Sequence, residues 1–386
     1  MKGNMSMDIT LNREALLSAA LDVERIAPQH SPVELLRCAY LVTEEGKLTV
    51  AAGDVECALE RQVTCDIRRN GYAAVNAKLL ARMLRLLEGE TVSILASEKN
   101  TIEIKSGAAE YRIPALDASE YPRMELPFPE DTVAVTGIPR MVKRTAFAAS
   151  EEESAKPALK CVHLAFTEDG LTAVGCDGYR VASAKGKSGP AASVSILIPA
   201  ASLEKLARLV SDRDTLQVGV AGREVVFRKD GFLFSARQID GNYFDTDRLF
   251  QMVCGSFTVL TDAEAMREMI GSVTVVVGSQ NRFYLSFQGN RLQASCESES
   301  GASSGALEVV VLSGSPSGTF WYNPRMLMEC LKAQSGTMLL EAAQNGALIM
   351  KTDELTCVQL AVRAPHSTGK EAACSRKRAE DQTVAA

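Results

Sequence analysis

The sequence of 386 residues has little histidine and no paired cysteines. Its three histidines, His30, His163 and His366, are far apart, and none of its ten cysteines lies in a C-x-x-C motif. A structural metal site needs such ligands at close spacing, so we expect no bound metal, and nothing indicates a cofactor. Disulfide frameworks are typical of small exported domains. The scattered cysteines therefore predict reduced, mostly buried thiols in a cytoplasmic protein.

Long apolar runs and the motifs of common enzymes are missing as well. No run approaches the roughly 20 apolar residues of a membrane-spanning helix. The opening segment, MKGNMSMDIT, lacks the apolar stretch of a secretory signal. P-loop, dinucleotide-binding and H-E-x-x-H motifs do not occur. We therefore expect a protein that is neither membrane-spanning nor exported, and that is not an enzyme.

The sequence does contain one pattern three times. A strand followed by a helix is predicted in DITLNREALLSAALDV, in TVAVTGIPRMVKRTAFA and in FTVLTDAEAMREMI, and a strand-helix-strand segment follows each. The matching positions Asn76, Pro199 and Asn323 in those later segments are 123 and 124 residues apart. A period of this length is that of a whole domain. We expect three similar domains and a disordered tail, with these bounds: 7–129, 130–254, 255–364 and 365–386.

Alternating apolar and polar residues within each repeat predict short strands separated by turns. Such runs are Lys47–Ala52, Thr101–Ile104, Glu224–Arg228 and Phe283–Phe287. Because strands and helices do not alternate regularly, a doubly wound parallel sheet is disfavoured. The predicted fold class is α+β, with two helices packed on antiparallel sheets in each of three tandem domains.

The predicted helices carry basic residues opposite their apolar residues. In Ala77–Leu87 the basic face contains no acid, although the whole chain has a net charge of −6. On one helix such a face is usually just solvated, but its recurrence favours a shared positive surface that attracts phosphates without reading bases. The candidate residues are Lys78, Arg82, Arg85, Arg140, Lys143, Arg144, Lys205, Arg208, Arg325 and Lys332.

Several segments together resemble the bacterial sliding clamp family, the beta subunit of DNA polymerase III. They include GKLTVAAGDVE from Gly46, AVGCDGYRVA from Ala173, QIDGNYFDTDRL from Gln238, YNPRMLMECLK from Tyr322 and VQLAVR from Val358. The resemblance implies three similar domains per chain and two chains joined head to tail into a ring. The basic helix faces would then line a hole around double-stranded DNA, and the ring would tether the replicative polymerase.

The resemblance also implies a hydrophobic cleft for short peptides of the DNA polymerase III alpha subunit and the clamp loader. Aliphatic and aromatic anchors suit the apolar side chains of such peptides. The matching positions are Leu159, Cys176, Gly178, Tyr179, Arg180, Val181, Phe244, Leu249, Val358 and Leu360.

Closure of the implied homodimer ring needs two edge strands. We expect one of them to contain Tyr111 and Ile113. The other is expected at Thr274 and Val275, because the apolar run Val273–Val277 would be hazardous as an unpaired edge.

Two alternatives remain open. Phe244 and Tyr179 stand where the family has proline and histidine, which would fit a divergent paralogue, such as a resistance or mobile-element variant with altered peptide specificity. A protein of a different class would be an enzyme, with Cys176 beside Asp177 as the candidate nucleophile.

Overall fold

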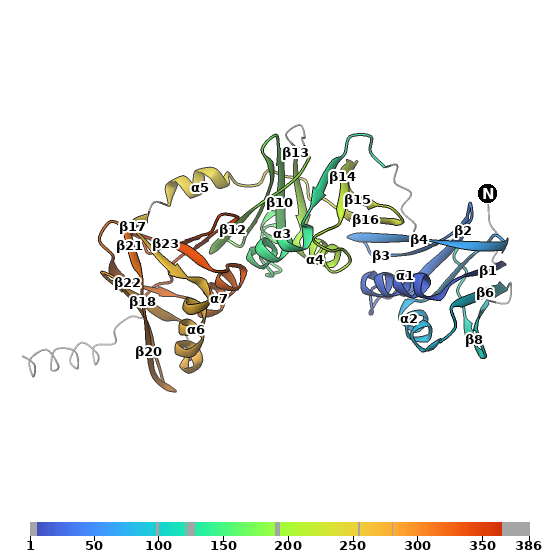
Figure 1. Cartoon of the computed structure of the whole chain (residues 1–386), viewed down its shortest axis with the longest axis horizontal. Helices are drawn as coiled ribbons and strands as arrows, with labels where there is room; N and C mark the ends of the chain where they lie inside the picture. The colour runs from blue at the N-terminus through green and yellow to red at the C-terminus, as the bar shows by residue number, and fades with distance from the viewer. Residues whose placement is uncertain are drawn as a thin grey trace, which may run out of the picture. The chain divides into compact units, whose positions relative to one another are not determined.

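The computed structural model describes residues 6–97, 100–119, 121, 128–189, 194–253, 255–279 and 281–364. The predicted tail, residues 365–386, lies outside them. The chain divides into two compact units (Figure 1): Met1–Gly178 with Ala182–Phe244, and Tyr179–Val181 with Asp245–Ala386. Within the described residues, no helix is long and apolar enough to cross a membrane.

The first repeat folds into strands and helices in the predicted order. Asparagines begin both of its α-helices: the Oδ1 atoms of Asn12 and Asn76 accept hydrogen bonds from the amides of Ala15 and Leu79. The elements are β1 (Met7–Asn12), α1 (Arg13–Ile26), the 3-10 helix η1 (Glu34–Arg37), β2 (Cys38–Glu44), β3 (Lys47–Gly53), β4 (Cys57–Arg69), β5 (Tyr72–Asn76), α2 (Ala77–Leu86), β6 (Thr91–Ser97), β7 (Thr101–Ser106) and β8 (Ala109–Pro114).

The second repeat has the same order of elements. They are β9 (Val133–Thr136), α3 (Ile138–Thr145), the 3-10 helices η2 (Ala146–Ala148) and η3 (Pro157–Lys160), β10 (Cys161–Thr167), β11 (Gly170–Cys176), β12 (Arg180–Gly186), β13 (Val194–Pro199), α4 (Ala200–Ala207), β14 (Thr215–Ala221), β15 (Glu224–Lys229) and β16 (Phe232–Arg237).

The third repeat follows a helix that the sequence pattern did not predict, α5 (Thr246–Met252), which Asp245 caps by accepting from the Arg248 amide. The other elements are β17 (Gly255–Asp262), α6 (Ala263–Val273), the 3-10 helix η4 (Thr274–Val276), β18 (Phe283–Gln288), β19 (Arg291–Ser298), β20 (Gly301–Glu308), β21 (Val310–Ser313), β22 (Ser317–Tyr322), α7 (Pro324–Ala333), β23 (Thr337–Ala343), β24 (Leu348–Lys351) and β25 (Leu355–Gln359).

Equivalent strands pair in the same way in the first and third repeats. In the first repeat β1 pairs with β4 and β6, and β2 pairs with β3 and β5. In the third, β17 pairs with β21 and β23, and β18 pairs with β19 and β22. All of these pairs are antiparallel. The predicted α+β class, with three tandem similar domains and two helices packed on sheets in each, is confirmed.

Strand β4 joins the first two repeats within the first unit. Its first five residues, Cys57–Arg61, pair antiparallel with Phe232–Ala236 of β16, which makes one continuous sheet of order β8-β7-β6-β1-β4-β16-β15-β14-β9. Helices α1 to α4 lie on the same side of this sheet (Figure 1). One cluster of buried apolar side chains, including Leu59 and Phe234, extends through both repeats. The helix faces of these two repeats are therefore presented by one packed body.

The predicted edge strand at Thr274 and Val275 is wrong, because this segment is the 3-10 helix η4 at the end of α6. The Thr274 hydroxyl donates to the carbonyl of Ile270, at 2.7 Å, and the Val277 amide donates to the carbonyl of Thr274. The Thr274 carbonyl and the Val277 amide, which a strand would use for pairing, are thus bonded to each other within the segment. Residues Tyr111 and Ile113 do lie on an edge strand, since β8 ends the sheet order.

Candidate functional site

Helix α2 presents its basic residues to solvent as predicted. Lys78, Arg82 and Arg85 are exposed, and the apolar residues that pack beneath them include Leu80 and Leu84. Two leucines that the sequence pattern placed on the buried face are instead outside: Leu79 is 37% exposed and Leu86 is 65% exposed. The exposed face of α2 is therefore both cationic and partly apolar.

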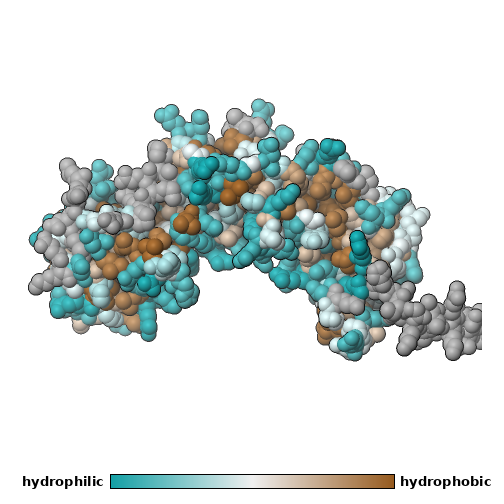
Figure 2. Space-filling model, turned by 180° about the vertical axis from the view of Figure 1, so that it is seen from behind, coloured by the Kyte–Doolittle hydropathy of each residue, from teal (hydrophilic) through white to brown (hydrophobic). Residues whose placement is uncertain are grey.

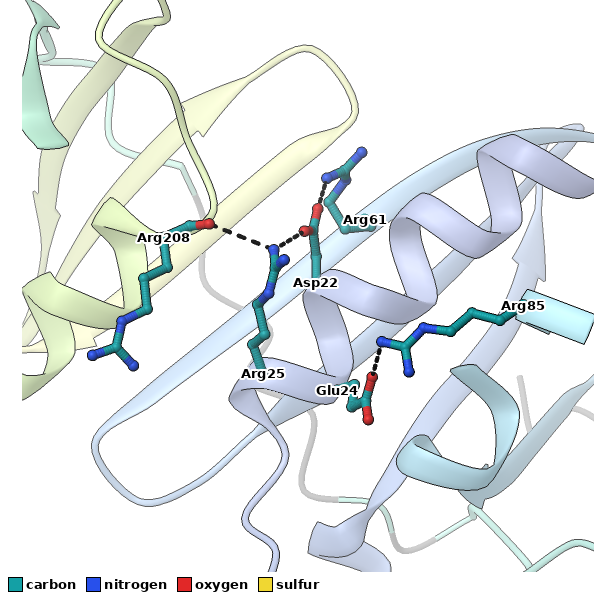
Figure 3. Close-up of polar contacts among 6 residues, drawn as sticks. All are labelled: Asp22, Glu24, Arg25, Arg61, Arg85 and Arg208. Carbon is teal, nitrogen blue, oxygen red and sulfur yellow. Dashed lines mark hydrogen bonds and ion pairs between the residues drawn. The ribbon is translucent and has the colours of Figure 1, made fainter. Parts of the chain in front are cut away.

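A buried carboxylate anchors α1 against the sheet beside this face (Figure 3). Asp22 forms ion pairs with Arg25 on its own helix, at 3.2 Å, and with Arg61 of β4. Burial raises the pKa of Asp22, and the two guanidinium groups offset only part of that effect. The three residues are held in place by charge-assisted bonds rather than by packing alone.

Arg25 is a basic residue of this surface that the sequence pattern missed. Its side chain is 53% exposed, and its guanidinium donates to the backbone carbonyl of Arg208, at the end of α4 (Figure 3). The next acid along α1, Glu24, pairs with Arg85 at 3.2 Å. The acids near Arg25 in sequence made it inconspicuous. In the structure Asp22 is shared between Arg25 and Arg61, and Glu24 pairs with Arg85, so these acids offset only part of the positive charge of Arg25.

Lys205 has a different environment from the other predicted basic residues. Its Nζ donates to Asp54 Oδ2 at 2.8 Å, and Asp54 also accepts from the backbone amides of Glu56 and Cys57. Burial tends to lower the pKa of Lys205, but the bond to Asp54 outweighs it and raises that pKa. The charge of Lys205 is therefore neutralised inside the junction of the first two repeats.

The remaining basic residues lie on α3, on α4 and on α7. Arg140 and Lys143 are exposed, and Arg144 is half-buried. On α4 and α7, Arg208 and Arg325 form ion pairs one turn apart with Glu204 and Glu329, at 3.9 and 3.2 Å. Lys332 is exposed.

The residues predicted for the peptide cleft fall into both units. In the first unit Cys176 is buried, and its Sγ accepts from the amide of Gly178, whose φ of +92° favours glycine. Phe244 packs on Tyr243, which in turn stacks on His163, with ring centroids 4.2 and 4.9 Å apart. Leu159 is half-buried within the 3-10 helix η3.

In the second unit the structure brings two of the predicted cleft residues together at the surface. The Leu360 amide donates to the Tyr179 carbonyl at 2.9 Å, and these side chains are 40% and 58% exposed. Val181 and Val358 are buried, and Leu249 of α5 is half-buried. On the face opposite to that of Figure 1, most surface residues are hydrophilic, and smaller hydrophobic patches lie among them (Figure 2).

The chemistry of Cys176 does not support the enzyme alternative. Burial raises the pKa of its thiol to about 11, so the reactive thiolate is scarce at neutral pH. All eight cysteines of the described residues are free and buried, as predicted. In the same part of the chain no group of His, Cys, Asp or Glu is placed to hold a metal ion.

Comparison with known proteins places this architecture in a family. Residues 7–125 match the DNA polymerase III beta subunit, N-terminal domain, and residues 132–245 match its central domain. The chain belongs to the DNA polymerase III beta subunit family. Sequence relatives include the beta sliding clamps of Bacillus subtilis, 26% identical over 63% of this chain and 68% of the relative, and of Synechococcus elongatus, 23% identical over 86% and 91%.

Solved structures of beta subunits share the fold. The DNA polymerase sliding clamp from Bacillus subtilis superposes with a TM-score of 0.87 at 20% identity, covering 93% of this chain and 100% of that one. A putative DNA polymerase III beta subunit from Eubacterium rectale has a TM-score of 0.86 at 16% identity and the same coverage. The chain is thus a divergent beta subunit with the clamp fold.

Proposed function

We propose that two copies of this chain close head to tail into a ring around double-stranded DNA and hold the replicative polymerase on it. The observation that carries the proposal is the set of cationic helix faces on one side of the first unit, in a chain whose net charge is −6. Such faces attract phosphates, whereas the rest of an acidic protein repels them. The protein would act in the cytoplasm and would catalyse no reaction.

A ring needs only weak contacts with DNA. Attraction between exposed lysine and arginine side chains and phosphates is independent of sequence, and it weakens as salt rises. The exposed residues Lys78, Arg82 and Lys143 suit this task, since they carry no ion pair among the described contacts. A linked ring that slides freely would keep the polymerase near its template.

The junction inside the first unit suggests how two chains close. There β4 of the first repeat pairs with β16, the last strand of the second repeat. By element order, β20 in the third repeat corresponds to β4, and β8 in the first corresponds to β16. Strands β20 and β8 each lie at the edge of their sheet. We therefore propose that β20 of one chain pairs with β8 of the other, in place of the segment at Thr274.

The same correspondence gives a register for this interface. Counted from the hairpin turns, Ser303 corresponds to Leu59, and Tyr111 corresponds to Phe234. Leu59 and Phe234 lie opposite each other in the first unit, and both are 0% exposed. We therefore expect Tyr111 to lie opposite Ser303 of the second chain and to be buried there.

Partner peptides would bind at the exposed apolar pair formed by Tyr179 and Leu360. The aromatic ring and the aliphatic side chain suit the apolar anchors of a short peptide, here one from the DNA polymerase III alpha subunit or the clamp loader. Leu249, another predicted cleft residue of the second unit, would shape the specificity of binding there.

The test is the solution mass of the purified chain, together with its retention on nicked circular DNA after loading. We expect the mass of a dimer and slow release from circles, with rapid loss once the circles are linearised. A monomer, or equal release from circular and linear DNA, would contradict the proposal.

A further inference from the structure

A buried glutamine lies between two residues of the predicted cleft. Gln359, the last residue of β25, separates Val358 from Leu360 and is only 1% exposed. Its Nε2 donates to the backbone carbonyl of Leu360 at 3.2 Å and lies 4.0 Å from Met326 Sδ of α7. Its Oε1 is buried and accepts no hydrogen bond from any residue that the structure describes. A buried acceptor without a donor destabilises a folded protein.

The fold does not require a polar residue at this position. When the strands are aligned by their hairpin turns, the residues of β16 and β8 that correspond to Gln359 are Ala236 and Ile113. Both are apolar, and they are 0% and 9% exposed. Gln359 therefore destabilises its repeat in a way that the other two repeats avoid. Local departures of this kind are expected where a residue serves function.

The hydrogen bond from Gln359 completes the anchoring of Leu360. The Leu360 amide donates to the Tyr179 carbonyl at 2.9 Å, so the peptide groups on both sides of the Leu360 Cα atom are held. Because a residue has only two soft backbone dihedrals, holding both peptide groups fixes the direction of its side chain. The Leu360 side chain, which is 40% exposed, is thereby held in one orientation at the surface.

Tyr179 is itself a firm anchor for Leu360. Its neighbour Arg180, another predicted cleft residue, is only 7% exposed. Arg180 NH1 donates to Glu329 Oε2 at 2.5 Å and to the Met326 carbonyl at 3.2 Å, both on α7. The Tyr179 carbonyl therefore belongs to a backbone segment that is fastened to α7, and Gln359 supplies the second attachment of Leu360.

We propose that Gln359 is a positioning residue for the peptide-binding surface formed by Tyr179 and Leu360, and that it lowers the stability of the second unit in doing so. Its Nε2 holds Leu360 in the orientation that receives the apolar anchor of a short peptide. Its Oε1 is left buried without a donor as a consequence. This inference rests on the function proposed above.

The test compares Gln359→Met with Gln334→Met. Methionine has about the length of glutamine, but it has neither the amide donor nor the carbonyl oxygen. Gln334 is a matched control in the same unit, since it is 3% exposed and both ends of its amide are bonded. Its Nε2 donates to the Met350 carbonyl at 3.2 Å, and its Oε1 accepts from the Thr352 hydroxyl at 2.9 Å.

Peptide binding measures the positioning directly. The probe is a fluorescein-labelled peptide with the C-terminal residues of the DNA polymerase III alpha subunit, followed by fluorescence anisotropy. We expect Gln359→Met to weaken binding about fivefold, the scale of one neutral hydrogen bond. Gln334→Met should change binding less than twofold. Equal effects of the two substitutions, or unchanged binding by Gln359→Met, would overturn the proposal.

Thermal unfolding should change in opposite directions for the two variants. Gln359→Met removes the buried oxygen that lacks a donor and should raise the melting temperature by about 2 °C. Gln334→Met leaves the buried Met350 carbonyl without its donor and should lower the melting temperature by about 4 °C. A Gln359→Met variant that binds peptide less well and also melts at a lower temperature would have lost general stability, and that result would overturn the proposal.

Hydrogen exchange tests the positioning without any peptide. Gln359→Met should speed exchange of the Leu360 amide about fivefold, because Leu360 loses one of its two attachments. The Val362 amide, which donates to the Trp321 carbonyl at 2.8 Å, is the internal reference and should keep its rate. An unchanged Leu360 rate would overturn the proposal. If the unsubstituted chain fails to bind the peptide, the proposed function fails at that point, and the exchange rates still decide whether Gln359 holds Leu360.

Discussion

Lys205 of α4 and Asp54 of the loop between β3 and β4 form an ion pair, with Nζ 2.8 Å from Oδ2, that joins two repeats 151 residues apart in the chain. The two side chains are 27% and 21% exposed, so the pair is shielded from much of the solvent. It lies beside the strand junction of β4 and β16, where Cys57 pairs with Ala236. Polar and backbone contacts together therefore fix the angle between the first two repeats.

We expect Asp54→Asn to lower the free energy of unfolding of the first unit by about 1–2 kcal/mol at pH 7, because a charge-assisted bond is lost. Burial tends to raise the pKa of Asp54, but the bonds from Lys205 and the amides of Cys57 and Glu56 outweigh it and lower that pKa below 3.8. A carboxyl whose pKa is depressed on folding stabilises the protein above its unfolded pKa and loses that contribution as pH falls through its folded pKa.

The measurement is thermal unfolding of the variant and of the unsubstituted chain at several pH values. The difference in melting temperature should be constant between pH 5 and 7 and should shrink below about pH 3.8. Glu103→Gln is a suitable control, since that carboxylate pairs with Arg112 within one hairpin of the first repeat. A difference in melting temperature that stays the same at low pH would show that Asp54 stabilises the protein by packing rather than by its charge.

The neutralised charge of Lys205 leads to a prediction about DNA. Lys78→Gln and Arg82→Gln should each speed release from nicked circular DNA and reduce the salt dependence of release by about one phosphate contact. Lys205→Gln should change release no more than Arg291→Gln, an exposed arginine on β19 that serves as the control. The measurement is the release rate at several salt concentrations. An effect of Lys205→Gln as large as that of Arg82→Gln would show that its pair with Asp54 opens on DNA.

Most of the fold could be predicted from sequence because its signals are local. Asn76 and Asn323 mark helix starts in two repeats, and each caps its helix in the structure. The helix α5 was missed although Asp245, its cap, is a recognisable start signal. The run at Thr274 was misassigned because β-branched residues favour strands in general, whereas the hydrogen bond to Ile270 keeps this one helical.

The candidate site could be predicted only in part, because exposure and ion pairing depend on distant residues. Nothing near Lys205 in sequence indicates that Asp54 is its partner. Arg25 was overlooked for a related reason: Asp22, its near neighbour, pairs with Arg61 of β4 as well as with Arg25, and so offsets only part of the Arg25 charge. A pattern of charge along a helix therefore gives the candidate face but not the residues that remain available on it.

Cys176 should be inert to alkylation. With a thiol pKa of about 11, roughly one molecule in a thousand is a thiolate at pH 8. We expect iodoacetamide to label Cys176 at pH 8 far more slowly than free cysteine, as measured by mass spectrometry of the corresponding peptide. Cys176→Ser should leave ring assembly and peptide binding within about twofold. Rapid labelling of Cys176 in the folded chain would support the alternative in which this thiol is a reactive nucleophile.

The proposed pairing of β20 with β8 predicts one disulfide across two chains. In the register taken from Leu59 and Phe234, Tyr111→Cys and Ser303→Cys face each other at the 4.5–5.5 Å Cα spacing of directly opposed antiparallel residues. That spacing fits a disulfide. We expect the double variant to form a covalent dimer on mild oxidation, seen by non-reducing gel electrophoresis.

The control moves one cysteine by a single position. Tyr111→Cys with Ala302→Cys places the thiols on opposite faces of the paired strands, so cross-linking should fall at least 10-fold, because successive side chains alternate between faces. The single substitutions report any reaction of the native thiols. Efficient cross-linking through Ala302→Cys alone would mean that the register is shifted by one residue. A solution dimer that neither pair cross-links would mean that β8 and β20 are not the closing edges, and the ring would need a different interface.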